Sequence, residues 1–175
     1  MNTENKSNTP KEIKDLWQTP KFVFDYYDRR FGFTCDFAAS HKNALCEHYF
    51  SEPVNGEGGA LGASKDDVCF DGSGAVWCNP PYSDIMPWVK ECYRLSHETG
   101  KVFVMLIPAD TSVKWFKLAF ENCTECHFIS GRLSFINAET RKPVSGNNKG
   151  SVVFIFDPKS PVKQSVHLID RDSMK

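Results

Sequence analysis

The sequence has 175 residues, a formal net charge of −1 and 41% hydrophobic residues. This length suits one domain with a buried core, and the near-neutral charge excludes a global basic field, so any contact with nucleic acid must depend on local patches. No apolar run is long enough to cross a bilayer and the N-terminus is too polar for a signal peptide, so we expect a cytoplasmic chain with seven reduced cysteines.

Residues 1–15 are polar and of mixed charge, which is typical of a flexible leader. Thr19 and Pro20 then predict a helix start, with Thr19 as the N-cap and Pro20 in the first turn. Apolar residues follow on one face until Gly32, which is suited to end the helix: Phe22, Val23, Tyr26, Tyr27 and Phe31. Because free N–H groups at a helix start bind anions, Thr19 has two open roles, as a cap alone or as a cap that also binds an anionic ligand.

Residues 32–38 alternate and are rich in β-forming side chains, so we expect the first strand of a sheet there. Asp36 lies at its end, followed by the small residues Ala38 and Ala39, which allow a ligand to approach the backbone closely. A carboxylate here is suited to accept hydrogen bonds from an amine or from ribose hydroxyls, and the alternative is an Asp that only stabilises a turn. Ser40 predicts the cap of a short helix that continues to Tyr49.

Residues 51–75 lack a regular pattern and contain glycines at positions 56, 58, 59, 62, 72 and 74. A phosphate-binding loop does not fit, because the required strand-to-helix context is missing. We expect a mobile segment that closes over a ligand, with Asp66, Asp67 or Asp71 in contact with it.

A stiff corner follows at residues 76–83, with the sequence Val-Trp-Cys-Asn-Pro-Pro-Tyr-Ser. Val76 to Cys78 are typical of the end of a buried strand, and Pro80 and Pro81 prevent both continued strand pairing and an immediate helix. Ser83 and Asp84 predict the cap of a helix over residues 84–98, which Gly100 ends. A strand, a polar turn and a helix place the turn at the carboxyl edge of a sheet, where such folds bind ligands.

The residues of this corner fit one chemical task, the orientation of an exocyclic amine on a nucleobase. The lone pair of such an amine is delocalised into the ring, and two acceptors aimed at its N–H groups would localise it. Asn79 offers a side-chain oxygen and Pro80 a backbone carbonyl, while Pro81 keeps both in one geometry. Tyr82 offers a flat face for a flipped-out base. The alternative is an ordinary surface turn, since all four residue types are common in turns.

The continuous apolar run from Lys101 to Ile107 is typical of a central parallel strand. Asp110 follows it and is expected to cap a helix over residues 112–120; the alternative is a side chain that faces the ligand pocket. Residues 151–156 predict another strand, the antiparallel partner in a C-terminal hairpin. Residues 158–175 are polar, and we assign this tail no function.

The stretch Cys123-Thr-Glu-Cys126-His127 matches the attachment string of c-type haem. That chemistry requires export, and a zinc site would need a second cysteine pair, so we predict no metal or haem here. These residues instead predict the start of a strand over residues 126–129.

Gly131 predicts a tight turn before a strand over residues 133–136. Residues 137–150 form a basic loop with Arg141, Lys142 and Lys149, suited to backbone contacts or base readout in DNA; the alternative is a solvated loop without such contacts.

Four ordered blocks of the chain resemble the phage-type DNA adenine-N6 methyltransferase (Dam) family. They are residues 17–20, residues 36–40 with Asn43-Ala44-Leu45, residues 77–82, and Gly131-Arg132-Leu133. The tetrapeptide Asn-Pro-Pro-Tyr alone is shared with protein-glutamine and RNA methyltransferases, whereas the ordered set of blocks is much more specific. The resemblance covers about residues 16–157, taken as the methyltransferase domain between the leader and the tail. The family shows an Asp-x-Ala-Ala block where other Rossmann-like methyltransferases have a glycine-rich loop.

The resemblance implies an α/β fold of the Rossmann-like class with a mixed, mostly parallel sheet. It also implies methyl transfer from S-adenosylmethionine to adenine N6 of double-stranded DNA by a monomer. It makes Trp17 and Thr19 candidates for the cofactor pocket, with a hydrophobic anchor as the alternative for Trp17. It makes Arg132 a candidate for a DNA phosphate or for fixing the catalytic loop, with an internal salt bridge as the alternative.

The expected site residues fall into three groups. The catalytic residues are Asn79, Pro80, Pro81 and Tyr82. The cofactor-binding residues are Trp17, Thr19, Pro20, Asp36, Ala38, Ala39 and Asn79. The DNA-binding residues are Arg132, Arg141, Lys142 and Lys149. Two other functions stay open: methylation of another planar nitrogen (cytosine N4, an RNA base or a protein glutamine), and a non-catalytic binding module on the same fold.

Overall fold

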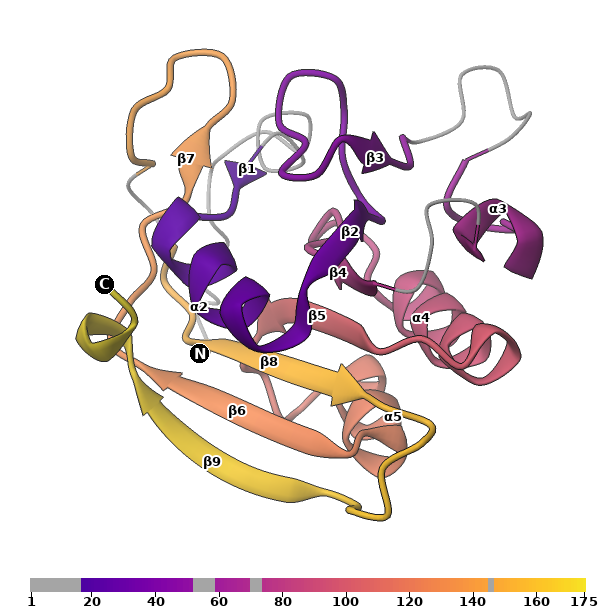
Figure 1. Ribbon diagram of the computed structural model, residues 1–175. Helices are drawn as coiled ribbons and strands as arrows, with labels where there is room; N and C mark the ends of the chain where they lie inside the picture. Colours follow the sequence, from indigo (N-terminus) through magenta and orange to yellow (C-terminus); the bar gives the residue numbers. More distant parts are fainter. Residues whose placement is uncertain (1–16, 52–58, 70–73, 145–146) are drawn as a thin grey trace, which may run out of the picture.

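The structure, a computed structural model, describes residues 17–51, 59–69, 74–144 and 147–175. A twisted sheet runs through its centre, with α2 on one face and α4 and α5 on the other (Figure 1). The predicted leader, residues 1–15, lies outside the described residues.

The central sheet has seven strands in the order β3-β2-β4-β5-β8-β6-β9. Their bounds are β2 Phe33–Asp36, β3 His48–Tyr49, β4 Ala75–Cys78, β5 Phe103–Pro108, β6 Glu125–Ser130, β8 Ser151–Phe156 and β9 Ser165–Asp170. The first four strands in this order are parallel, and β8 is antiparallel to both β5 and β6. This mixed, mostly parallel sheet confirms the predicted Rossmann-like fold and the antiparallel position of β8.

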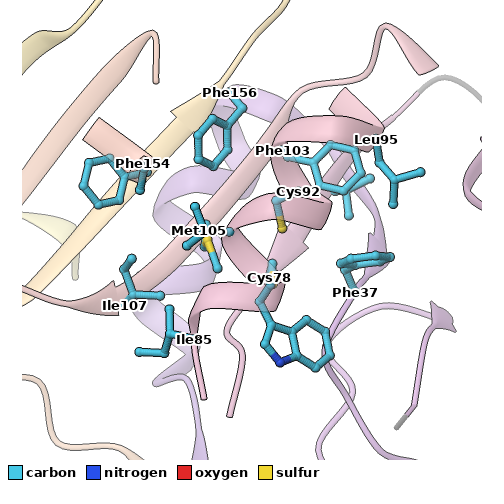
Figure 2. Packing of buried hydrophobic residues seen from close by; sticks show 14 of the residues in the cluster. Phe37, Cys78, Ile85, Cys92, Leu95, Phe103, Met105, Ile107, Phe154 and Phe156 are labelled. Atoms are coloured by element: carbon cyan, nitrogen blue, oxygen red, sulfur yellow. The ribbon is translucent and has the colours of Figure 1, made fainter. Parts of the chain in front are cut away.

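The middle strands are buried on both faces because every residue of β4 and β8, and all of β5 but Pro108, is buried. Successive side chains alternate between two cores. On one face, Cys78, Phe103 and Met105 pack against α4 (Met86–Thr99) and α5 (Lys114–Asn122), as Figure 2 shows for part of this cluster. On the other face, Trp77 and Val104 pack against α2 (Lys21–Phe31) and the short helix η1 (Arg171–Met174).

Helices α2 and α4 form where predicted but begin at other residues than expected. Gly32 and Gly100 end α2 and α4 with left-handed φ angles of 63° and 70°, as expected for glycine. At the other ends, the N-cap residues are Pro20 and Ile85, and neither helix has a side-chain cap bond. The predicted caps Thr19 and Ser83-Asp84 were therefore wrong, because the chain enters each helix one or two residues later.

The helix predicted from Ser40 to Tyr49 was also wrong. The Asn43 side-chain oxygen accepts hydrogen bonds from Ser40 N at 2.6 Å and Ser40 Oγ at 3.0 Å, which closes a turn. Leu45 N donates to Asp36 Oδ2 at 3.1 Å instead of to a helical carbonyl. The segment is thus held against the end of β2, and it continues as β3.

The predicted mobile segment is partly structured. Residues 59–69 include the short helix α3 (Lys65–Cys69), and Ala60, Ala63 and Val68 are buried in the core. Arg94 of α4 donates to Ala63 O at 2.8 Å. This contact joins the segment to α4, and its closure over a ligand stays a prediction; Asp71 lies outside the described residues.

Two expectations for the C-terminal part of the chain, a strand over residues 133–136 and a tail without a strand, were wrong. Residues 133–135 form no strand, and β7 (Ile136–Asn137) pairs instead with β1 (Trp17–Gln18) in a separate two-stranded sheet. The segment assigned to a tail carries β9, which pairs in parallel with β6. The domain boundaries themselves stay predictions. Within the described residues, no helix has the length and apolar character needed to cross a membrane.

Gly74 offers a test of the close contact between β2 and β4. A Cβ atom there would lie 2.1 Å from Thr34 Cγ2 and 2.8 Å from Gly32 O. Gly74→Ala should therefore lower the free energy of unfolding by about 2–3 kcal/mol in urea unfolding. The matched control Gly150→Ala should be near neutral, because its Cβ would meet Ala109 Cβ at 3.7 Å.

Adding Thr34→Ala to Gly74→Ala should recover only part of this loss, since the backbone oxygen of Gly32 remains in place. Full recovery, or no loss in the single variant, would contradict the packing described here.

Candidate functional site

Three loops meet at the carboxyl edge of the parallel strands. They follow β2, β4 and β5 and begin at Phe37, Asn79 and Ala109. Phe37 N donates to Trp77 O at 2.7 Å, so the loop after β2 continues beside the end of β4. Because β8 runs antiparallel, its first residues join the same edge, where Gly150 O accepts a hydrogen bond from Ala109 N at 2.9 Å. The topology therefore brings the Asp36 and Asn79 blocks together.

The corner after β4 is anchored in the core. Pro80 is buried, Asn79 and Pro81 are half-buried, and Tyr82 packs against both core clusters. Tyr82 as a whole is half-buried while its hydroxyl is fully buried, and this burial raises the pKa of Tyr82 well above its ordinary value. Tyr82 is thus a neutral phenol.

Phe135 connects the N-terminal block to this corner. Its ring stacks on Trp17 with centroids 5.8 Å apart and meets the Tyr82 ring edge-on at 5.8 Å. The pairing of Gln18 with Ile136 fixes the same arrangement through the backbone. Sequence reasoning missed this role of Phe135, although the residue lies two positions after the Gly131-Arg132-Leu133 block of the family pattern.

Four of the predicted site residues carry a buried polar atom without a hydrogen-bond partner among the described residues. These atoms are Trp17 Nε1, Thr19 Oγ1, Asn79 Oδ1 and Tyr82 OH. Outside the predicted site, Thr34 Oγ1 and Trp77 Nε1 share the property. A buried polar atom left unpaired costs about 1–3 kcal/mol, so a cluster of them is typical of a site that binds a polar ligand.

Thr19 has a hydroxyl that does not cap the helix. The first turn of α2 is closed by the backbone, since Val23 N donates to Pro20 O at 3.0 Å. Thr19 is only 2% exposed, and its hydroxyl stands beside the N-terminus of an 11-residue helix. The capping role proposed from the sequence is excluded, and the binding of an anionic ligand by the hydroxyl stays a prediction.

Asp36 organises the loop after β2. Its carboxylate accepts hydrogen bonds from Leu45 N at 3.1 Å and Ala38 N at 3.4 Å. Burial raises the pKa of Asp36 to about 6, and the two backbone bonds oppose part of this shift. The turn-stabilising role considered from the sequence is therefore present, and a role in cofactor binding stays a prediction.

The four predicted DNA-binding residues differ in their surroundings. Lys149 Nζ lies 2.5 Å from Asp110 Oδ2, and this contact lowers the pKa of Asp110 to about 2. Arg141 has a left-handed φ of 56° and donates to Gln18 Oε1 and to Lys42 O, both at 3.2 Å. Both side chains thus have protein partners.

Arg132 and Lys142 are exposed and have no ion pair among the described residues, so the internal salt bridge considered for Arg132 has no support. A DNA contact by any of the four side chains stays a prediction.

Asp110 does not cap α5 directly. Its Oδ1 accepts hydrogen bonds from Ser112 N at 3.1 Å and Ser112 Oγ at 2.5 Å, and the helix begins at Lys114 after the N-cap Val113. The predicted cap was therefore wrong in detail. Asp110 instead closes the turn before the helix and binds Lys149, which joins the loop after β5 to the residues before β8.

A family model and two relatives that match this chain carry the same description. The model of the family described as DNA N-6-adenine-methyltransferase (Dam) matches residues 6–175. The DNA N-6-adenine-methyltransferase of Escherichia phage T1 is 37% identical over 180 residues, which cover 93% of this chain and 71% of that protein. The DNA N-6-adenine-methyltransferase of Haemophilus phage HP1 (strain HP1c1) is 35% identical over 160 residues, which cover 89% of this chain and 86% of that protein.

The raised pKa of Asp36 predicts a specific pH dependence of stability. Between its ordinary value of 3.8 and about 6, the folded state holds a proton that the unfolded state has lost. This contribution to stability is therefore complete below pH 4 and lost as the pH rises through about 6, with an upper bound of about 3 kcal/mol.

Asp36→Asn removes the titrating group while keeping the shape of the side chain. The difference in unfolding free energy, wild type minus variant, should fall between pH 4 and pH 7 in urea titrations. A difference that does not change over this interval would show that Asp36 titrates normally.

Proposed function

Because the chain belongs to the DNA N-6-adenine-methyltransferase (Dam) family, we propose that it transfers a methyl group from S-adenosylmethionine to N6 of adenine in double-stranded DNA. The observation that carries this proposal is the set of unpartnered buried polar atoms on Trp17, Thr19, Asn79 and Tyr82, at the edge where the family-matching blocks meet. Since the curated relatives come from phages, we place the reaction in the cytoplasm of a host cell.

The corner after β4 acts on the target base. The Asn79 side-chain oxygen and the Pro80 carbonyl accept the two N–H bonds of the adenine amine, which localises its lone pair toward the methyl donor. The two prolines hold these acceptors in place before the base arrives, so little reorganisation is needed. Tyr82 offers the extruded base an aromatic ring for stacking, and the buried Phe135 ring supports Tyr82 by packing edge-on against it. The product ammonium is acidic enough to lose its proton without a dedicated base.

The residues present fit the cofactor in charge and in polarity. S-adenosylmethionine supplies an activated methyl group on its sulfonium. The Thr19 hydroxyl, the Trp17 indole N–H and the N-terminus of α2 are suited to its carboxylate. Asp36 is suited to its amine or ribose hydroxyls, and Ala38 and Ala39 let it approach the backbone.

DNA contact is assigned to local cations, because the chain has a net charge of −1. Arg132 and Lys142 are exposed and are suited to phosphates. Arg141 and Lys149 stabilise the loops that they join. They can contact DNA only if a phosphate replaces their present protein partners.

The substrate class is tested by incubating the purified chain with tritiated S-adenosylmethionine and, separately, unmethylated duplex DNA, RNA or protein. The proposal requires label in DNA, with N6-methyladenine as the modified nucleoside after digestion. Label in N4-methylcytosine, RNA or protein glutamine would establish the rival methyltransferase. The absence of both label and any heat of S-adenosylmethionine binding in calorimetry would support the non-catalytic module, whose degenerate pocket does not bind the cofactor.

Asn79→Ala should lower the methyl transfer rate by a factor of about 10² to 10³, because one of the two acceptors on the amine is lost. Pro80→Ala keeps the carbonyl but loosens it, so its rate should also fall. In both variants, the dissociation constant of S-adenosylmethionine in calorimetry should change little. A large loss of cofactor affinity would assign Asn79 to the cofactor instead of the base.

Thr19→Val removes the buried hydroxyl and keeps the side-chain shape, so it isolates one polar contact. We expect cofactor affinity to fall by a factor of about 10, since a hydrogen bond to a charged group is lost. Thr34→Val is the matched control, because it removes another unpartnered buried hydroxyl outside the site. Equal effects of the two substitutions would mean that Thr19 contributes only packing.

A further inference from the structure

Strands β6 and β9 bring two histidines and a carboxylate together on one side of the sheet. The parallel register pairs His127 with His167 and Glu125 with Ser165. Glu125 and His127 are two residues apart on one strand, so both side chains point to the face covered by α2. None of these residues belongs to the candidate active site.

The donor atoms of Glu125, His127 and His167 all lie within 4.8 Å of one another. His127 Nε2 is 2.9 Å from Glu125 Oε2, and the two histidine rings have centroids 4.9 Å apart. Ligands about 2.0–2.2 Å from a tetrahedral ion lie roughly 3.3–3.6 Å apart, so small side-chain rotations would bring these donors to that spacing. Two imidazoles and one carboxylate form a donor set that transition metals bind well.

A supporting contact already orients the buried histidine. His127 Nδ1 lies 3.2 Å from Tyr27 OH on α2, which leaves Nε2 to face Glu125. Histidine ligands of metal ions typically have such a partner on the second ring nitrogen. Burial raises the pKa of Tyr27 well above its ordinary value, so its hydroxyl keeps its proton.

Arg30 sets a limit on the affinity of this cluster for a cation. Its guanidinium contacts both oxygens of Glu125, with Nη1 2.9 Å from Oε2. A metal ion at Oε2 would replace this bond and the bond to His127, while Oε1 would remain with Arg30. The nearby positive charge makes the site weaker than a structural zinc site with four protein ligands.

We propose that Glu125, His127 and His167 form a binding site for a divalent transition metal ion of the Zn²⁺ or Co²⁺ class, which fastens the edge strand β9 to the sheet. A water molecule or Ser165 Oγ, which lies 2.8 Å from His167 Nε2, completes the coordination. The site uses the histidine of the Cys123–His127 string but not its cysteines, since Cys126 faces the opposite core.

The test is a titration of the purified full chain with Co²⁺, followed by its visible d–d absorption. The wild type should bind a single equivalent at this site. His167→Ala should weaken binding by a factor of about 10 or more, because it removes one ligand from an exposed strand position without opening the core. The matched control His97→Ala removes an exposed histidine on α4 and should leave binding unchanged.

A second readout measures whether the metal ion stabilises the attachment of β9 to the sheet. Zn²⁺ should raise the unfolding midpoint of the wild type and of His97→Ala, but not that of His167→Ala. The proposal is overturned if neither ion binds, if His167→Ala binds as tightly as the wild type, or if intense sulfur-to-cobalt charge-transfer bands show cysteine ligation. In those cases the cluster is a hydrogen-bond network that links α2, β6 and β9.

Discussion

The structure depends on how β4 ends. Its four residues are completely buried between β2 and β5, and the chain then meets two consecutive prolines that allow neither further strand pairing nor a helix. The corner is therefore fixed by the core behind it, not by contacts in the loop itself. Asn79 is the first residue after β4, at the edge of the sheet where the loops after β2 and β5 also begin. The packing of the central strands therefore sets the position of its backbone and so the region that its side-chain oxygen can reach.

Aromatic and polar contacts extend this constraint to the rest of the site. Trp17 and Tyr82 come from distant parts of the chain, and both rest on Phe135. Around them lie polar atoms that the protein buries without pairing, at a cost that folding alone does not explain. Asp36 shows the opposite arrangement, since two backbone N–H groups already satisfy its carboxylate. The site thus combines a loop after β2 that internal hydrogen bonds hold in place with buried donors and acceptors that have no protein partner. This arrangement is expected of a preorganised enzyme.

Local sequence predicted the parts that local forces decide. The apolar runs of β5 and β8, the glycine ends of α2 and α4, and the strand-corner-helix order around Asn79 all follow from residue type and spacing. The helix expected after Ser40 does not continue beyond one turn, because the Asp36 carboxylate binds the Leu45 N–H that the next helical bond would use. Contacts between distant segments were also missed: Phe135 as a bridge, β9 beside β6, and His127 beside His167. Such pairings depend on the register of strands far apart in the chain, which no short pattern encodes.

The central claim is that the oxygens of Asn79 and Pro80 receive the amine of the target adenine. A crystal structure of the chain with S-adenosylhomocysteine and a methylatable DNA duplex measures this directly. We expect an extruded adenine whose N6 lies within hydrogen-bond distance of both oxygens, with Thr19 and Trp17 facing the cofactor's carboxylate. An adenine bound elsewhere, with both oxygens turned away from its amine, would contradict the account.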